Sequence, residues 1–496
     1  MHTRQAKWLV AFIIFACLLF LIELRGMGAA VMLLVASGYF VTLSKVEMIR
    51  VVQATPVLIY PLLALFSCIW SEAPAITLRL SLQFLLTAGI GVLLYRTIPF
   101  RIFVSALFAA SLWACAAGLS MSLQGVLVGL PMAGVAESKN MMAFFTGLLA
   151  LSATAIFTDR GSSHLLRLAS IGGGLFGVLC LFLAQSAGAL VGTFLGMGVI
   201  FAARFFQSAA AVVRLTIVVA VLLLLPVGIL AQSLLASEAT EFSEDVLGKD
   251  ATLTGRTYLW SRAGEYIAEK PLVGHGYGAF WRQGSVEPEG LWQMYGITTR
   301  SGFNFHNQFI EALMDVGYVG LVVFVGMLLL TMATLATRLL RGGSPELPFY
   351  AGMFVALAVR TPVESVMLTQ FNIIAILLFM CSCAAIYGHE ATPVRLALGA
   401  RRRRLRRQKQ DKGLVQRRTV LKRRREKRVV QVRAPRAVVR QRKRRGKRVL
   451  RQTKAGAFRA APTGQTTIVE ETREAAASAP APVDAIRAPT EDALTP

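Results

Sequence analysis

The stretch FNFHNQFIEALMDVGYVGLVVFVGMLLLTMATLAT, from Phe303 to Thr337, joins a polar segment to a long apolar run. Between Val316 and Thr337 no side chain is charged. Such a run is long enough to cross the hydrocarbon layer of a bilayer, about 30 Å thick, as a helix. His306 and Asn307 stand shortly before it. The stretch therefore predicts a transmembrane helix preceded by two polar side chains, whose chemistry depends on the side of the membrane they face.

The rest of the chain repeats this apolar character. The 496 residues are 55% hydrophobic with a mean hydropathy of +0.57, whereas soluble proteins have roughly 45–50% apolar residues. Apolar segments of about the length of a transmembrane helix, roughly 17–25 residues, recur along the chain. They cover residues 7–22, 27–44, 51–70, 76–95, 101–119, 140–157, 166–184, 187–203, 211–232, 316–337, 347–360 and 366–387. We therefore expect an all-α polytopic membrane protein with about twelve transmembrane helices.

Basic residues set the expected orientation, because cytoplasmic loops are enriched in Lys and Arg. Alternate loops carry most of them, whereas the loops between hold few. The basic set is Arg4, Lys7, Lys45, Arg50, Arg96, Arg101, Arg160, Arg167, Arg204, Arg214, Arg338 and Arg341. Both termini are thus expected in the cytoplasm. The segment 233–315, between the ninth and tenth spans, becomes a large external, periplasmic loop.

The external segment contains one expected helix, Thr257–Glu269, which a following proline ends. Within it Leu259, Ala263 and Ile267 recur at helical spacing, so the helix should lie against the membrane surface or the mouth of the bundle. The stretch GHGYGAFW, residues 274–281, follows. Its glycines predict a tight turn, since no strand precedes them to form a phosphate-binding loop.

The net charge of +26 belongs to one part of the chain. Residues 401–454 hold 27 Lys and Arg against two acidic residues, which accounts for +25. We therefore expect a membrane domain at 1–390, a basic cytoplasmic segment at 391–460 and a disordered Ala/Pro-rich tail at 461–496. Anionic lipid head groups are the first expected partner of the basic segment, followed by an acidic protein. Nucleic acid is not favoured, because the basic block that begins at residue 401 has no aromatic side chain before Phe458 to stack on bases.

Several kinds of site are absent from the sequence. All six cysteines lie in apolar segments and have no partner at metal-ligand spacing, so they predict neither a disulfide framework nor a zinc site. No Ser/His/Asp triad, metal-spaced carboxylates, P-loop or dinucleotide fingerprint stands out. Any chemistry must come from the few polar residues at the expected external face.

Arg256, in TGRTYLW (Thr254–Trp260), is the first candidate. A guanidinium binds a phosphate through two parallel N–H bonds and stays charged at any working pH. The alternative is an arginine that is solvated or paired with an acidic side chain, as most loop arginines are.

His306 is the second candidate. Asn304 can cap a helix over about 305–316, and Gly317 suits a break before the next span. On such a helix His306 shares a face with Ile310 and Leu313, and an imidazole there can accept a proton from a hydroxyl. The alternative is a structural histidine, hydrogen-bonded at the interface.

Further polar positions lie on the expected external face. They are Lys139 and Asn140 before the sixth span, Arg79 inside the fourth, and Arg360 and Glu364 beside the last loop. Ionisable groups at the rim of a membrane span are often functional. Arg79 can instead extend to the interface, and Lys139 can be an ordinary loop charge. Arg360 and Glu364, four residues apart, can equally pair with each other.

Two blocks together carry a resemblance. TGRTYLWSRAGEYIAEKPLVGHGYGAF (254–280) and HNQFIEALMDVGYVGL (306–321) resemble the blocks that mark the bacterial O-antigen ligase and polysaccharide polymerase superfamily. The resemblance extends to the number of spans and the large late external loop, and covers about residues 1–390. Within that superfamily it most resembles the exopolysaccharide polymerases.

The resemblance implies a glycosyltransferase at the external face of the bacterial inner membrane. Its donor would be an oligosaccharide on undecaprenyl diphosphate, and it would need no metal or other cofactor. By this resemblance Arg256 holds the diphosphate and His306 activates the acceptor hydroxyl. Polysaccharide export or chain-length proteins are further expected partners. Whether the product is a polymer or a glycan ligated to a lipid core stays open.

The remaining substrate contacts are less defined. Arg79, Lys139 and Arg262 are the contenders for a second cation on the diphosphate, and Asn307 and His275 are candidates for other substrate contacts. The chain departs from the family pattern at two of these positions. His275 stands where an apolar residue is usual, and Lys139 stands near where an arginine is common.

Two other classes of function compete with an enzyme. A transporter or flippase of lipid-linked saccharides would use Arg256 and His306 only for binding. It would more naturally show inverted repeats and matching broken spans, which do not stand out here. A scaffold subunit would act through its basic tail.

Overall fold

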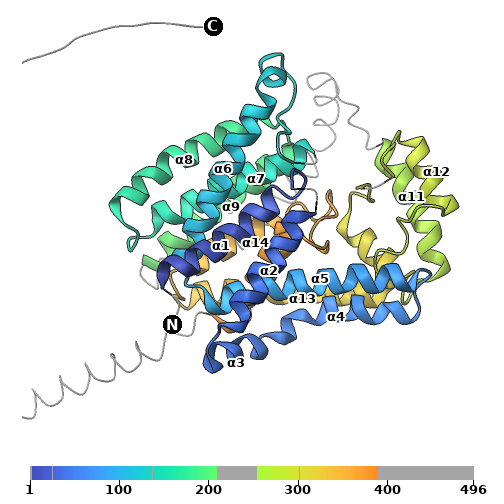
Figure 1. Ribbon diagram of the computed structural model, residues 1–496, viewed down its shortest axis with the longest axis horizontal. Helices are drawn as coiled ribbons and strands as arrows, with labels where there is room; N and C mark the ends of the chain where they lie inside the picture. The colour runs from blue at the N-terminus through green and yellow to red at the C-terminus, as the bar shows by residue number, and fades with distance from the viewer. Residues whose placement is uncertain (1–2, 25, 137, 209–253, 301, 389–496) are drawn as a thin grey trace, which may run out of the picture. The chain divides into compact units, whose positions relative to one another are not determined.

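The computed structural model describes residues 3–388 apart from 25, 137, 209–253 and 301, and within them every regular element is a helix (Figure 1). The helices are α1 Arg4–Leu19, α2 Met27–Val41, α3 Lys45–Gln53, η1 Thr55–Leu58, α4 Ile59–Phe66, η2 Ser67–Ile69, α5 Pro74–Thr97, α6 Phe100–Leu127, α7 Lys139–Thr158, α8 His164–Leu183, α9 Ala187–Ser208, α11 Thr254–Glu269, α12 Val286–Met294, α13 Gln308–Leu340, α14 Leu347–Ala358 and α15 Ile373–Tyr387. The expected all-α class is confirmed for this part of the chain. The expected span 211–232, the start of the external loop and the two tail segments lie outside the described residues.

Helix length supports a polytopic membrane protein without fixing the number of crossings. Six described helices are long and apolar enough to span a membrane, and a seventh follows if the pair Lys45–Gln53 and Thr55–Ile69, bent by 44°, counts as one. The apolar helices α2, α14 and α15 are shorter, with 15, 12 and 15 residues. A helix therefore lies at each expected span within the described residues, but helix length does not establish twelve crossings.

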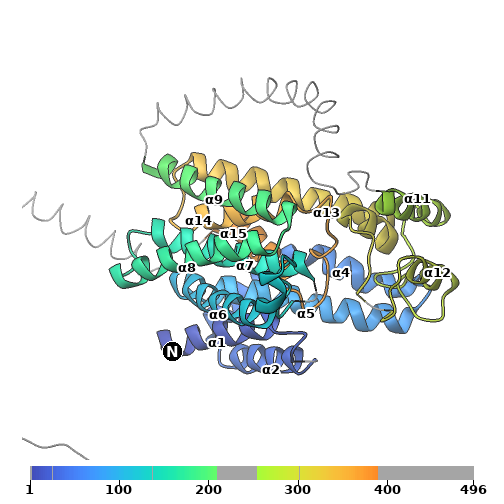
Figure 2. The ribbon, with the colours of Figure 1, turned by 90° about the horizontal axis from the view of Figure 1, so that it is seen from above.

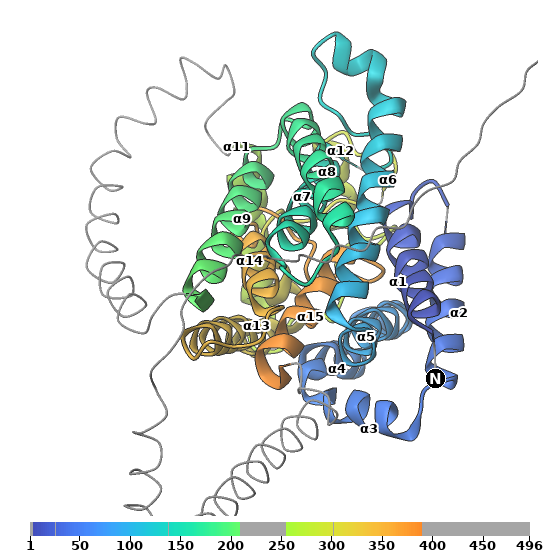
Figure 3. The same cartoon turned by 90° about the vertical axis from the view of Figure 1, so that its left-hand side faces the viewer.

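Helix α7 is the most buried of the long spans. Its most apolar 18-residue window is 83% buried, and α6, α8, α9 and α14 all contact it. Figure 3 views the described bundle from the side on which α7, α8 and α9 lie together. Because Ser138 caps the first turn of α7 through the Met141 N–H, this enclosed helix has a defined start, and its first two residues are Lys139 and Asn140.

Small residues let two other helices approach closely. A Cβ atom added to Gly196 of α9 would lie 2.7 Å from the carbonyl oxygen of Gly352 in α14. One added to Gly352 would lie 2.4 Å from the carbonyl oxygen of Gly196. The two backbones therefore touch without intervening side chains, as small residues allow in membrane helix pairs.

Helix α13 is broken at the glycine that the sequence indicated. Val316 and Gly317 have non-helical backbone angles, and Gly317 has φ +64°. A Cβ at Gly317 would lie 2.4 Å from the carbonyl carbon of Leu272, so only glycine fits here. The break separates a short arm, which begins at Gln308, from the long apolar part that Figure 2 shows running alongside the bundle.

The segment before the GHGYG turn completes the backbone hydrogen bonds of this break. The N–H groups of Tyr318 and Val319 donate to the carbonyl oxygens of Pro271 and Leu272, at 2.8 and 3.1 Å. Non-helical backbone in a membrane protein is stable only where protein groups satisfy it.

The turn itself adds bonds from the other side. The N–H groups of His275 and Gly276 donate to the carbonyl oxygens of Met314 and Asp315, at 2.8 and 2.9 Å. Gly274, Gly276 and Gly278 all have positive φ, as a tight turn requires. The expectation of a tight turn is confirmed, and the turn is docked onto α13.

Helices α11 and α12 lie together at one end of the described bundle (Figures 1 and 2). Leu259 and Ala263 of α11 are buried, with Phe280, Leu291 and Phe305 in the same apolar cluster. The expected helix at 257–269 is confirmed and starts at Thr254, whereas α12 was not expected.

The predicted helix start near His306 is wrong by three residues. Asn307, not Asn304, caps the helix, because its side chain accepts the N–H groups of Phe309 and Ile310 at 3.0 and 3.3 Å. Asn304 instead accepts the N–H of His306 at 2.8 Å. His306 therefore precedes the helix and shares no helical face with Ile310.

Candidate functional site

A cavity of about 370 Å³ lies at the starts of helices α7 and α9, and Arg256 of α11 borders it. It is lined by Lys139 and Asn140 of α7, Gln185 to Ala189 at the start of α9, Arg256 of α11, and Arg360, Val363 and Glu364 of the α14–α15 loop. A helix start presents free N–H groups and the positive end of the helix dipole. Two of them at one cavity, those of α7 and α9, favour an anionic ligand.

The charged side chains of the cavity strengthen this preference. Lys139, Arg256 and Arg360 supply positive charge, and Glu364 is the one carboxylate among the lining residues. Burial raises the pKa of Glu364, although the nearby charges of Arg360 and Arg256 oppose the rise. The cavity is therefore positive on balance.

Asn140 organises two of these charges. Its Nδ2 donates to Oε1 of Glu364 at 2.9 Å, and its backbone carbonyl accepts Nη2 of Arg360 at 3.2 Å. Among the described ion pairs, none joins Arg360 to Glu364. Asn140 thus holds the guanidinium and the carboxylate by separate contacts.

His306 lies within electrostatic reach of Arg256. Burial lowers the pKa of His306 to about 4, with a smaller contribution from the positive charge of Arg256. The imidazole is therefore neutral at neutral pH. Its Nδ1 is buried and has no hydrogen-bond partner among the described residues, so the ring keeps a nitrogen that these residues do not engage.

The backbone of His306 is strained. Its φ is +51°, and Gln185 at the cavity has φ +50°. A residue with a side chain rarely adopts this left-handed conformation, which costs about 1–3 kcal/mol and is found most often at functional sites. The strain is compensated by the Asn304 bond to the His306 N–H and by the cap at Asn307.

The segments that carry His306 and Glu364 form one unit. The Asn307 N–H donates to Oγ of Ser365 at 2.8 Å, and the Gln308 N–H donates to the carbonyl oxygen of Thr361 at 3.0 Å. In return, the Met367 N–H donates to Oε1 of Gln308 at 2.7 Å. The start of α13 is therefore fixed against the loop that contributes Arg360 and Glu364 to the cavity.

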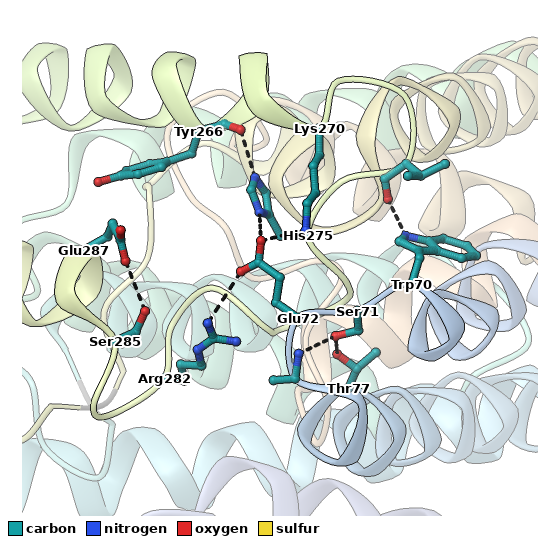
Figure 4. A network of polar contacts seen from close by, with 12 residues as sticks. Trp70, Ser71, Glu72, Thr77, Tyr266, Lys270, His275, Arg282, Ser285 and Glu287 are labelled. Atoms are coloured by element: carbon teal, nitrogen blue, oxygen red, sulfur yellow. Dashed lines mark hydrogen bonds and ion pairs between the residues drawn. The ribbon is translucent and has the colours of Figure 1, made fainter.

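His275 lies in a different cluster, around Glu72 (Figure 4). Its Nδ1 is 2.6 Å from Oε1 of Glu72 and its Nε2 is 2.8 Å from the carbonyl oxygen of Tyr266. Both ring nitrogens are therefore within hydrogen-bond distance of oxygen atoms of the protein. With 3% of its surface exposed, His275 leaves no ring nitrogen for a substrate in this arrangement.

Two cations, Lys270 and Arg282, complete the Glu72 cluster. Lys270 Nζ is 2.8 Å from Oε1 of Glu72, and Arg282 Nη2 is 3.5 Å from Oε2. Burial opposes ionisation of Glu72, but the hydrogen bonds from Lys270 and His275 outweigh it and lower the pKa of Glu72. The cluster joins the α4–α5 turn to the segment after α11.

The other predicted contacts are dispersed. Lys139 lines the cavity, as Arg256 does. Arg79 is an exposed residue of α5 and Arg262 contacts Glu265 and Tyr266 of its own helix; neither lines the cavity. Asn307 serves as the cap of α13.

The sequence did not predict Gln185, Ser186 or Asn140 as substrate contacts. For Arg360 and Glu364 it left open whether they pair with each other or contact a substrate. Asn140 follows Lys139, which was the available signal for it. Gln185 and Ser186 carry no chemical signal of their own, and only the meeting of α8, α9 and α14 places them here. Within the described residues, no three His, Cys, Asp or Glu side chains gather where they could hold a metal ion.

Comparisons with known proteins agree with the two sequence blocks. The O-antigen ligase family profile, Wzy_C, matches residues 172–325, which include Arg256 and His306. The chain is 32% identical over 325 residues to the exopolysaccharide production protein ExoQ of Rhizobium meliloti (strain 1021), a match that spans 64% of this chain and 74% of the relative.

Proposed function

The chain belongs to the bacterial O-antigen ligase and polysaccharide polymerase superfamily, and from this premise we propose that it polymerises lipid-linked oligosaccharide repeat units. Membership supports a multi-pass membrane protein that processes O-antigen or exopolysaccharide. The finer proposal is a metal-independent glycosyl transfer from undecaprenyl diphosphate at the external face of the bacterial inner membrane, with both termini in the cytoplasm. The relative's name, an exopolysaccharide production protein, supports a polymer as the product.

The observation that carries the proposal is a neutral imidazole beside a positive cavity. In the proposed reaction an acceptor hydroxyl oxygen attacks the anomeric carbon of the donor sugar while the bond from that carbon to the diphosphate oxygen breaks. The imidazole of His306 takes the hydroxyl proton, and the electron pair of the broken bond stays on the diphosphate. General base catalysis contributes about 10²–10⁴-fold.

The positive cavity fits the leaving group. Negative charge grows on the diphosphate as the bond breaks, and fixed cations and N–H groups stabilise it without reorganisation. Arg256 and Lys139 supply cations, and the starts of α7 and α9 supply N–H groups. His306 stays neutral beside these charges, as a base must.

A ligase that transfers the glycan to a lipid core is the second candidate, favoured by the description of the matching family profile. Purified full-length protein in lipid nanodiscs, incubated with an undecaprenyl-diphosphate-linked oligosaccharide, tests the proposal. Longer glycans on gels support a polymerase. Glycan appearing only when a lipid-core acceptor is added supports the ligase. No new glycosidic bond with either acceptor rejects enzymatic transfer and favours a transporter.

A further inference from the structure

Arg360 has an unusual environment for a guanidinium. It is 5% exposed, and its Nε and Nη1 are buried with no hydrogen-bond partner among the described residues. Its contacts are the Asn140 carbonyl, 3.2 Å from Nη2, and the ring of Phe144, whose centroid is 5.1 Å from Cζ. A buried charge of this kind is unfavourable unless it is paired. The side chain therefore has binding capacity that the protein does not use.

The obvious counter-ion is directed elsewhere. Glu364 lies one helical turn further along the same loop, and its N–H donates to the carbonyl oxygen of Arg360 at 2.9 Å. Its carboxylate, however, accepts the Asn140 side chain at 2.9 Å and forms no ion pair with Arg360 among the described residues. Glu364 therefore acts on Arg360 only through space, and the Arg360 nitrogens Nε and Nη1 keep no bonded partner among the described residues.

Arg360 borders the cavity of the candidate site. Arg360 lines the same space as Arg256 and Lys139, at the starts of α7 and α9. Arg256 comes from α11, whereas Arg360 comes from the α14–α15 loop, so the two guanidiniums belong to different segments that border one cavity. An anion with two phosphoryl groups can engage both, whereas a single phosphoryl group can fully engage only one.

We propose that Arg360 is the second guanidinium of the leaving-group site and binds one phosphoryl group of the donor diphosphate, while Arg256 binds the other. This inference rests on the proposed function. It assigns a role that Arg79 and Arg262 do not fill, because neither lines the cavity. The site takes a diphosphate in preference to a monophosphate because it offers two planar guanidinium groups, one for each phosphoryl group. Lys139 adds a third positive charge but no planar set of donors.

Binding of two soluble probes tests the assignment. Farnesyl diphosphate and farnesyl monophosphate share an apolar tail and differ by one phosphoryl group, and their affinities for the full-length protein in nanodiscs are measured by calorimetry. The wild type is expected to prefer the diphosphate. Arg360→Gln is expected to weaken diphosphate binding about 10–100-fold, since hydrogen bonds to charged groups contribute about 1.5–3 kcal/mol, and to affect the monophosphate much less.

The control is Arg300→Gln. Arg300 is an exposed arginine that pairs with Glu289 at 3.1 Å and does not line the cavity, so both affinities should stay at their wild-type values. Arg360→Lys covers the case in which the glutamine variant does not fold. Lysine keeps the positive charge but lacks the planar guanidinium donors, so Arg360→Lys should also reduce the preference for the diphosphate.

Wild-type preference in a folded Arg360 variant overturns the inference. Equal losses for the two probes also overturn it, because they would mean a structural role for Arg360. These results are separate from the test of the proposed function. A wild type that binds the diphosphate through Arg360 but forms no glycosidic bond would reject the enzyme and keep the anion site.

Discussion

Two charged clusters in the same membrane domain differ in what they leave unpaired. Around Glu72, one carboxylate faces Lys270, His275 and Arg282, and both nitrogens of His275 are engaged. In the cavity, Arg360 has two nitrogens without a partner among the described residues. A cluster that satisfies itself holds segments together, whereas one with unused donors suits a ligand.

The largest expected effect comes from the base. His306→Ala should lower glycosyl transfer about 10²–10⁴-fold, because no group remains at that position to take the hydroxyl proton. Farnesyl diphosphate binding should stay within a few-fold of wild type. His164→Ala, a change at an exposed residue at the start of α8, is the matched control and should leave transfer intact. Wild-type transfer by folded His306→Ala would remove His306 from the mechanism.

Arg256→Gln is expected to lower transfer about 10²–10³-fold, since one fixed cation of the leaving-group site is lost. It should also change the pH dependence. Arg256 helps to lower the pKa of His306, so removing its charge raises that pKa and protonates the base at higher pH. The acid limb of kcat/KM, which reports the free enzyme, should therefore move to higher pH. An acid limb at the wild-type pH would mean that Arg256 does not affect the pKa of the catalytic base.

Glu72→Gln should break the other cluster. It leaves the Lys270 ammonium and the buried His275 ring without their carboxylate partner, which costs about 1–3 kcal/mol of stability. We expect a lower midpoint of thermal unfolding in nanodiscs. Farnesyl diphosphate affinity should be unchanged, because Glu72 does not line the cavity. A change in farnesyl diphosphate affinity without a change in the unfolding midpoint would mean that Glu72 serves ligand binding and not stability.

The same carboxylate predicts a pH effect on the wild type. The pKa of Glu72 is lowered on folding, so its contribution to stability is present above the ordinary Glu value, about 4.3, and is lost as pH falls through the lower folded value. The unfolding midpoint should fall over that acidic range in the wild type and fall less in Glu72→Gln. Parallel acid profiles would mean that other carboxylates dominate.

The smallest expected effect is a gain. Glu364→Gln removes negative charge from an anion cavity and keeps an acceptor for the Asn140 side chain. Farnesyl diphosphate should bind about two- to fivefold more tightly, since one carboxylate among three cations opposes the anion weakly. Weaker binding would indicate that Glu364 positions the cations instead of opposing the ligand.

Local signals were predictable from the sequence. Apolar runs located helices at each expected span within the described residues, and helical spacing located α11. Gly317 marked the break in α13, because a positive φ suits glycine and little else. The cap was misplaced because Asn304 and Asn307 are equally good caps by type, and His306 takes a conformation that sequence rules assign to few residues.

The assembly of the site was not predictable in the same way. Lys139, Gln185, Arg256 and Arg360 are far apart in the chain, and they meet only because α7, α9, α11 and the α14–α15 loop pack together. Arg360 and Glu364 both bond to Asn140, which lies 220 residues from Arg360 and 224 from Glu364. Likewise, His275 is occupied by Glu72, 203 residues away. Spacing along one helix cannot decide between such partners.

The break in α13 has a mechanical consequence for turnover. Peptide groups on both sides of Gly317 are bonded to the chain from Pro271 to Gly276, directly after the helix that carries Arg256. An outward movement of this segment with α11 alone would break the four bonds from Pro271, Leu272, His275 and Gly276 to α13. We therefore expect α11 and the short arm of α13 either to stay in place or to move together as one body.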